Sequence, residues 1–310
     1  MDETIKSYKA FDENMQCRGF QYEVGKEYDM NGDIKCCKRG FHACESPIEV
    51  WDYYDMLTSR FAEVEQSGKI STEADSTKVC SSHIKIKAEL KLADIINIGV
   101  EWLKDLTSPS KIKDDSATLN DGGFDKKQIG SSGDSAKIGS SGYSAKIGSS
   151  GDSAQIGSSG YSAQIGSSGD YAQIGSSGDS AKIGSSGGYA KIGSSGDSAK
   201  IGSSGDSAQI GSSGDSAKIG SSGDSAKIGS SGDSAKIDST GEDSVIMCAG
   251  PRSVAKAKIG SWITLADWDW DDRKGRLVPV CVKTERVDGI KIKPDTWYKL
   301  QDGEFVEVTE

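Results

Sequence analysis

The chain has 310 residues, of which 35% are hydrophobic and 39 are glycine, and its formal net charge is −10 at pH 7. That length suffices for two average domains or for one elongated repeat body with caps. The acidic balance argues against nucleic-acid binding, which needs clustered Lys and Arg. An acidic surface could instead attract a basic partner.

The amino-terminal residues contain no basic segment followed by an apolar stretch, and no run approaches the roughly 18 apolar residues of a membrane helix. We therefore expect neither a secretion signal nor a membrane span. The seven cysteines are an odd number, and Cys36 and Cys37 are adjacent. Without a secretion signal they are expected to be reduced thiols in a cytoplasmic protein.

Residues 1–108 have mixed composition and are predicted to form an N-terminal α+β domain. Alternating polar and apolar residues predict short strands, and these lie at 8–11, 20–24, 61–66 and 83–90. Segment 46–57 is expected to be helical, with Ser46 as the N-cap and Pro47 in the first turn. A second amphipathic helix is predicted over 92–106.

A nine-residue repeat dominates residues 109–254. The unit IGSSG recurs twelve times between Ile129 and Ile228, and an imperfect earlier copy lies at 115–123. A strict period of this kind is typical of a solenoid. A flexible Gly/Ser linker is the alternative, but an Ile at one fixed position would have no purpose there.

Each repeat can supply one short strand and one corner. In SAKIG, Ala136 and Ile138 would point inward and Lys137 outward, and Gly133 could take the positive φ of a sharp turn. Two such units make a flattened coil of about 18 residues. The substitutions support that length, because they come in pairs two repeats apart: Tyr143 and Tyr161, Tyr171 and Tyr189, and Gln155 and Gln173.

The repeat offers a binding surface but no obvious chemistry. Its Asp column could suggest calcium, yet the double Gly of calcium-binding nonapeptides is missing, and we interpret the column as a solvated, charge-balanced face. The side chains predicted to present a binding surface are Asp134, Lys137, Tyr143, Tyr161, Tyr171, Tyr189, Asp197 and Lys200.

Residues 255–310 return to ordinary composition and are predicted to form a C-terminal β cap. Strands are expected at 262–270, 277–287, 289–293, 296–300 and 304–308. The tryptophans of this segment are expected to fill the cap. The overall fold class is therefore mainly β: a nonapeptide β-solenoid between an N-terminal α+β domain and a C-terminal β cap.

Reactive side chains concentrate in DIKCCKRGFHAC and just upstream of it. Cys and His residues can bind zinc tetrahedrally, although the spacing here is not the paired C-x-x-C form. The candidate ligands are Cys17, Cys36, Cys37, His42 and Cys44. A thiol nucleophile activated by His42 or His83 is a second hypothesis. Glu63, Glu65 and the acidic run 266–272 could supply catalytic carboxylates, but acidic turns and solvent-facing strands explain them more simply.

The two ends of the chain resemble a known group. CRGFQYEVGKEY, GFHACESPIEVWDYY and VDGIKIKPDTWYKLQDGEFVEV are similar to an uncharacterised domain family of bacterial and phage or prophage genomes, whose members carry Ser/Gly-rich nonapeptide arrays. The resemblance implies a phage-linked setting inside a bacterial host cell and a host-directed or anti-defence role. It implies no activity.

A looser likeness concerns ADP-ribosyltransferases. YKAF followed by GFHACESPIEVWDYY resembles their order of a strand, a Gly-aromatic strand and a Tyr-bearing helix. Carried over, His42 and either Tyr53 or Tyr54 would lie near a nicotinamide pocket, with NAD as the cofactor. The usual His or Arg of the first strand is not evident here.

From these patterns we predict a non-enzymatic interaction protein that uses a rigid solenoid to bind or inhibit a host macromolecule, without a cofactor. The expected partner is a host protein rather than nucleic acid or membrane, and the chain could also form a homodimer. An enzyme using NAD or zinc in residues 1–108, with the solenoid as spacer, and a purely structural scaffold are the alternatives.

Overall fold

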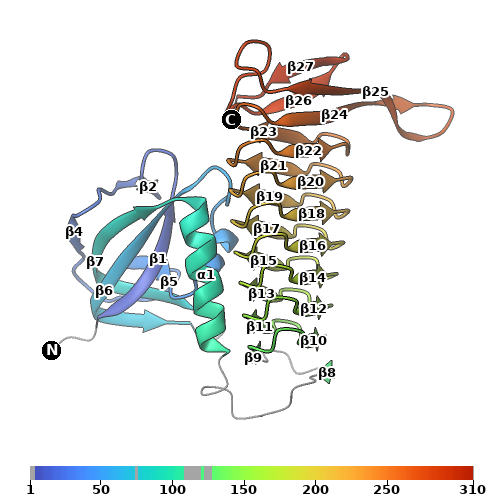
Figure 1. The fold of residues 1–310 in the computed structure, drawn as a ribbon. Coiled ribbons are helices and arrows are strands. Elements are labelled where there is room, and N and C mark those ends of the chain that lie inside the picture. The colour runs from blue at the N-terminus through green and yellow to red at the C-terminus, as the bar shows by residue number, and fades with distance from the viewer. Residues whose placement is uncertain (1–3, 74–75, 108–119, 122–127, 310) are drawn as a thin grey trace. The chain divides into compact units, whose positions relative to one another are not determined.

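A computed structural model describes residues 4–73, 76–107, 120–121 and 128–309. The chain forms two compact units, Met1–Trp102 and Leu103–Glu310. It is mainly β, with a solenoid in the second unit, as the sequence predicts (Figure 1). Most of the imperfect repeat copy at 115–123 lies outside the described residues. Within the described part of the chain, no helix is long and apolar enough to cross a membrane.

The first unit is built on an antiparallel five-stranded sheet in the order β4-β7-β5-β1-β6. Its strands are β1 (Ile5–Phe11), β4 (Glu27–Asp29), β5 (Phe41–Cys44), β6 (Arg60–Thr72) and β7 (Lys78–Leu90). A small hairpin pairs β2 (Gln16–Cys17) with β3 (Phe20–Gln21). The helical elements are the 3₁₀ helix η1 (Pro47–Asp52) and the α-helix α1 (Leu92–Leu106), whose residues from Leu103 onward belong to the second unit.

The long strands β6 and β7 also pair with each other, which closes the sheet on itself. The enclosed core contains Phe11, Phe41, Val64 and Ile84 among its buried side chains. One buried polar residue bridges the strands: Gln66 accepts a hydrogen bond from Ser7 and donates to the carbonyl of Phe41 at 2.7 Å. Its amide is therefore satisfied inside the closed sheet.

The predicted elements of this unit are mostly present. Helix 92–106 is confirmed, and the strands predicted at 8–11, 61–66 and 83–90 lie inside longer ones. Only Phe20–Gln21 of the predicted strand 20–24 pairs. The helix predicted over 46–57 is a single 3₁₀ element, Pro47–Asp52, and the Ser46 side chain makes no capping hydrogen bond.

The solenoid of the second unit has two parallel sheets, and consecutive strands alternate between them. One sheet contains β8 (Asn120–Asp121), β10 (Lys137–Ser140), β12 (Gln155–Ser158), β14 (Gln173–Ser176), β16 (Lys191–Ser194), β18 (Gln209–Ser212), β20 (Lys227–Ser230) and β22 (Val245–Cys248). The other contains β9 (Gln128–Ser131), β11 (Lys146–Ser149), β13 (Gln164–Ser167), β15 (Lys182–Ser185), β17 (Lys200–Ser203), β19 (Lys218–Ser221), β21 (Lys236–Ser239) and β23 (Val254–Ala257).

From β9 to β23, strands two repeats apart pair in register, so equivalent residues of the repeat stack in columns. Ile138 lies beside Ile156, and Ile156 beside Ile174. The Ile columns of both sheets form one continuous buried core. The tyrosine pairs confirm the coil length: the rings of Tyr143 and Tyr161 stack 5.2 Å apart and those of Tyr171 and Tyr189 stack 5.5 Å apart.

The second glycine of the repeat has a different role from the predicted one. Gly133 does not take a positive φ; from Tyr189 onward that conformation falls on the residue two positions after this glycine, such as Tyr189 or Ser207 at φ 57° and 56°. The glycine is needed because coils approach closely. A Cβ on Gly214 would lie 2.0 Å from the carbonyl oxygen of Gly196 in the preceding coil.

The C-terminal strands extend both sheets beyond the repeats. They are β24 (Trp262–Asp271), β25 (Arg276–Arg286), β26 (Tyr298–Gln301) and β27 (Glu304–Glu307). β24 adds to one sheet in parallel, and β26 adds to the other antiparallel to β23. Buried Val287, Tyr298 and Leu300 continue the core of the solenoid. The predicted strand 289–293 is absent, because the backbone bends over 289–292 and pairs with no strand.

Candidate functional site

The first unit contains a cavity of about 340 Å³. Its lining includes most of the reactive residues that the sequence analysis identified. Six of those residues line the cavity, namely Cys17, Cys37, His42, Cys44, Tyr53 and Tyr54. The remaining lining residues are Tyr8, Lys9, Ala10, Arg18, Phe20, Tyr22, Met30, Lys38, Arg39, Gly40, Phe41, Ala43, Val50 and Lys78.

A glycine allows strand β5 to form one wall of the cavity. Gly40 has φ +132°, and a Cβ there would lie 2.2 Å from the Sγ of Cys80. Only glycine tolerates both the conformation and the close approach. Strand β5 then pairs with β7, with His42 opposite Cys80. The close contact with Cys80 of β7 therefore explains why the GFHAC motif begins with a glycine.

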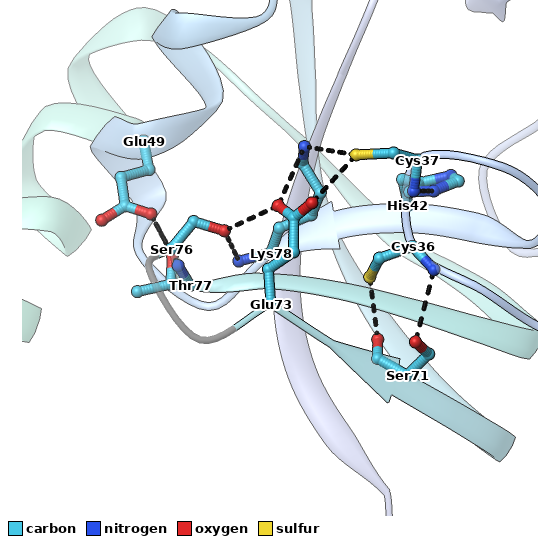
Figure 2. Close-up of polar contacts among 9 residues, drawn as sticks. All are labelled: Cys36, Cys37, His42, Glu49, Ser71, Glu73, Ser76, Thr77 and Lys78. Carbon is cyan, nitrogen blue, oxygen red and sulfur yellow. Dashed lines mark hydrogen bonds and ion pairs between the residues drawn. The ribbon is translucent and has the colours of Figure 1, made fainter.

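A buried glutamate helps to hold the part of the lining that follows from η1. Glu49 of η1 accepts hydrogen bonds from the backbone N–H and the hydroxyl of Thr77, at 2.9 and 2.6 Å. These contacts connect η1 to the start of β7 (Figure 2). Tyr53 and Tyr54 directly follow η1, so their position depends on this connection.

His42 is held as a neutral imidazole. Its Nε2 accepts a hydrogen bond from the backbone N–H of Cys37 at 3.0 Å. Burial, and then the nearby cations Lys9, Arg18 and Lys78, lower the pKa of His42. Because this acceptor nitrogen already binds a backbone N–H, His42 is not positioned to act as a general base that deprotonates a thiol.

Lys9 lies in the wall of the cavity and is only 5% exposed. Its ammonium donates to the carbonyl of His42 at 2.8 Å and contacts the Sγ of Cys17 at 3.5 Å. It also lies 5.3 Å from the centroid of the Tyr22 ring. Burial lowers the pKa of Lys9, because the charged form is poorly solvated there.

A polar network lies beside the cavity (Figure 2). The Cys37 thiol donates to Glu73 at 3.0 Å, and Lys78 contacts both Cys37 at 3.4 Å and Glu73 at 3.4 Å. The Lys78 ammonium also lies 4.2 Å from the centroid of the Tyr53 ring. The exposed thiol of Cys37 is thus bonded to a carboxylate and a lysine rather than to a histidine side chain.

The structure does not bring the five candidate zinc ligands together. Cys36 donates to the carbonyl of Ser71 at 3.0 Å, and the hydroxyl of Tyr54 donates to Cys17 at 2.8 Å. Burial raises the pKa of Cys44 to about 12, which disfavours the thiolate that binds zinc. Among the described residues, no group of three His, Cys, Asp or Glu side chains has a geometry suited to a metal.

The other candidate catalytic residues lie outside the cavity lining. Glu63 pairs with Lys6 at 2.9 Å and Glu65 with Lys87 at 2.8 Å. His83 contacts Asp29 at 2.8 Å on the outside of the sheet. The two Glu–Lys contacts are partly exposed ion pairs, which contribute little to stability.

The predicted binding surface of the repeat is divided among several sides of the solenoid. Lys137 and Lys200 lie on strands of different sheets. The tyrosine pair at 143 and 161 occupies the corners that follow even-numbered strands, whereas the pair at 171 and 189 occupies the corners that follow odd-numbered strands. Asp134 belongs to the same corner column as the second pair, and Asp197 to that of the first.

The Asp column also has a role within the fold. The Oδ1 of Asp197 accepts from the backbone N–H of Asp215 at 3.3 Å, and the Oδ1 of Asp215 accepts from that of Asp233 at 2.8 Å. Each of these carboxylates thereby satisfies an N–H of the next coil while remaining exposed. The column is a structural ladder as well as a solvated face.

Comparison with known proteins gives a family match for part of the chain and no activity. Residues 5–98 match a family model described as a domain of unknown function, DUF7666. The match covers the closed sheet and every residue of the cavity, and it agrees with the resemblance to an uncharacterised domain family. No curated protein and no solved structure matches the chain.

Sequence reasoning missed the basic residues of the cavity, namely Lys9, Arg18, Lys38, Arg39 and Lys78. They come from four separate segments, and only the closure of the sheet brings them together. The one available signal was the unusual Lys9 in an otherwise apolar half of the first strand, YKAF.

Proposed function

We propose that the chain is a non-enzymatic interaction protein whose solenoid binds an extended, acidic protein segment. The observation that carries this proposal is the outer face of strands β10, β12, β14, β16, β18 and β20, hereafter the even face. It is long, flat and regular, and its outward positions contain only Lys, Gln and Gly.

Two parallel rows make up the even face. One row contains three ammonium and three amide groups: Lys137, Gln155, Gln173, Lys191, Gln209 and Lys227. The other consists of glycines, and a Cβ added at Gly157, Gly193 or Gly211 would meet nothing within 4 Å. Gln155, Lys191 and Lys227 border a shallow groove that follows the glycine row.

The chemistry of this face suits a partner rich in acceptors. The outward side chains of these six strands donate hydrogen bonds, and none is a carboxylate. Rows repeat about every 4.8 Å along the solenoid, so an extended chain can meet several donors in succession. A rigid ladder also loses little conformational entropy on binding. We place this partner in a bacterial host, where binding would inhibit it or hold it in place, in keeping with the phage-linked resemblance.

Charge reversal on the even face tests the proposal. The full chain and its Lys191→Glu/Lys227→Glu variant would be used to capture proteins from bacterial lysate. Because two favourable charge contacts become repulsive, retention of the partner should fall at least about tenfold. Lys26→Glu is the matched control, since Lys26 is exposed and belongs to the other unit. Equal retention by all three proteins would refute binding by the even face.

A further inference from the structure

The cavity of the first unit has a charge opposite to that of the chain. The chain carries a net charge of −10, yet five of the residues that line the cavity are Lys or Arg, and none of its described lining residues is Asp or Glu. Arg18, Lys38 and Arg39 are exposed at the cavity, whereas Lys9 is buried in its wall. A concave site lined by one sign of charge concentrates ligands of the opposite sign.

Lys9 gives the strongest indication of an anion. A buried ammonium is normally paired with a carboxylate, because leaving it unpaired is costly. Within the described residues, Lys9 has no carboxylate within ion-pair distance. Its hydrogen-bond partners there are one carbonyl and one thiol, which leaves a third N–H with no oxygen, nitrogen or sulfur acceptor and only the rings of Phe11 and Tyr22, whose centroids are 5.5 and 5.3 Å away. An anion bound in the cavity would supply both the acceptor and the missing charge.

The cavity also offers rings for a planar group. Six of the residues that line it are aromatic: Tyr8, Phe20, Tyr22, Phe41, Tyr53 and Tyr54. Phe20 contacts Tyr22 edge to face with centroids 4.8 Å apart, and Phe20 is 43% exposed. Exposed aromatic faces beside cations are the surroundings in which nucleobases stack.

From the cavity, its basic and carboxylate-free lining and its aromatic walls, we infer that the first unit binds a nucleoside phosphate. Its volume of about 340 Å³ lies at the lower end of the range for small-molecule sites, which favours a mononucleotide over a dinucleotide. This site is separate from the even face, because every residue that lines it belongs to the first unit. The proposal for the even face and the inference for the cavity can therefore be refuted independently of each other.

Calorimetric titration of the full chain would use four probes: adenosine 5′-monophosphate, uridine 5′-monophosphate, adenosine and inorganic phosphate. Since binding needs both the anion and the ring, at least one monophosphate should bind about tenfold more tightly than adenosine and than phosphate. Its affinity should fall as salt rises from about 50 to about 500 mM. No heat of binding at about 1 mM of any monophosphate would overturn the inference, and so would equal affinity for phosphate alone.

Substitutions distinguish the cavity from adventitious surface binding. Arg18→Gln and Lys38→Gln change exposed side chains, so the fold should persist, and together they should weaken monophosphate binding at least about tenfold. Lys9→Met should abolish binding, with circular dichroism as the check on folding. Lys26→Gln removes an exposed charge outside the cavity and should leave the affinity unchanged. Wild-type affinity in the Arg18→Gln/Lys38→Gln variant would refute the assignment.

Discussion

The two glycines of a single repeat should respond oppositely to the same substitution. Gly211 lies on the even face, where a Cβ would meet nothing within 4 Å. Gly214 lies in the following corner, where a Cβ would be 2.0 Å from the Gly196 oxygen and 2.5 Å from its carbonyl carbon. The two variants have the same composition and differ only in the position of one methyl group.

The size of the effect follows from these distances. An ordinary Cβ contact begins at 3.4 Å, so alanine at position 214 requires a displacement of more than 1 Å between coils that are about 4.8 Å apart. Overpacking costs about 1–3 kcal/mol, and loss of a neighbouring ladder bond, such as Ser213 N–H to Ser194 O at 3.0 Å, costs about 1 kcal/mol more. Gly214→Ala should therefore destabilise the solenoid by about 2–4 kcal/mol. Gly211→Ala should be neutral or stabilise by about 0.5–1 kcal/mol.

Amide hydrogen exchange of the full-length variants is the suitable assay, because a solenoid can open locally without unfolding as a whole. Gly214→Ala should lower the protection of the strands on either side of the substitution, and thermal unfolding by circular dichroism should shift to lower temperature. Equal protection in the two variants would show that coil spacing does not depend on the second glycine, and the argument from close approach would fail.

Three further predictions concern single side chains. Ile210→Ala should lower the free energy of chemical unfolding by about 2–4 kcal/mol, because Ile210 is buried in the core column. Ser212→Ala should be neutral, since the buried Ser212 hydroxyl has no hydrogen-bond partner among the described residues. An equal loss of stability in the two variants would contradict this difference. Tyr161→Ser should cost less than about 1 kcal/mol, because the stacked pair is exposed, and a larger loss would mean that the stack sustains the coil. The pKa of His42 is lowered in the fold, so unfolding takes up a proton below pH about 6.5, and the free energy of unfolding should fall as pH drops through that value. His42→Asn should remove this dependence of stability on pH, measured by chemical unfolding from pH about 7 to about 5. An unchanged pH dependence in the variant would show that other groups cause it.

The solenoid is the part of this protein that the sequence specifies most completely. The two-repeat spacing of the tyrosine pairs predicts the coil, and the stacked rings confirm it. Ile138 points inward as predicted, because alternation along a strand is a local property of the backbone. Every coil repeats the same local pattern, so the nonapeptide and its two-repeat spacing predict both the strands and the coil length.

The role of the second glycine could not be read from one repeat. A Cβ at this position would collide with a carbonyl of the preceding coil, and that contact exists only once coils are stacked. Consecutive repeats contribute strands to alternate sheets. The predicted binding residues Lys137 and Lys200 therefore lie on different sheets, although each is a plausible surface residue in the linear pattern.

The cavity depends entirely on tertiary structure. Lys9, Arg18 and Lys78 lie in separate segments of the sequence, and Arg18 and Lys78 each look like an ordinary surface cation. The pairing of β1, β5 and β7 and the position of the β2–β3 hairpin place them around one space whose described lining contains no carboxylate. The sequence by itself determined the coil, because stacking repeats a local rule. Only the tertiary structure determined the cavity, because electrostatic interactions depend on distance in space and not on separation along the chain.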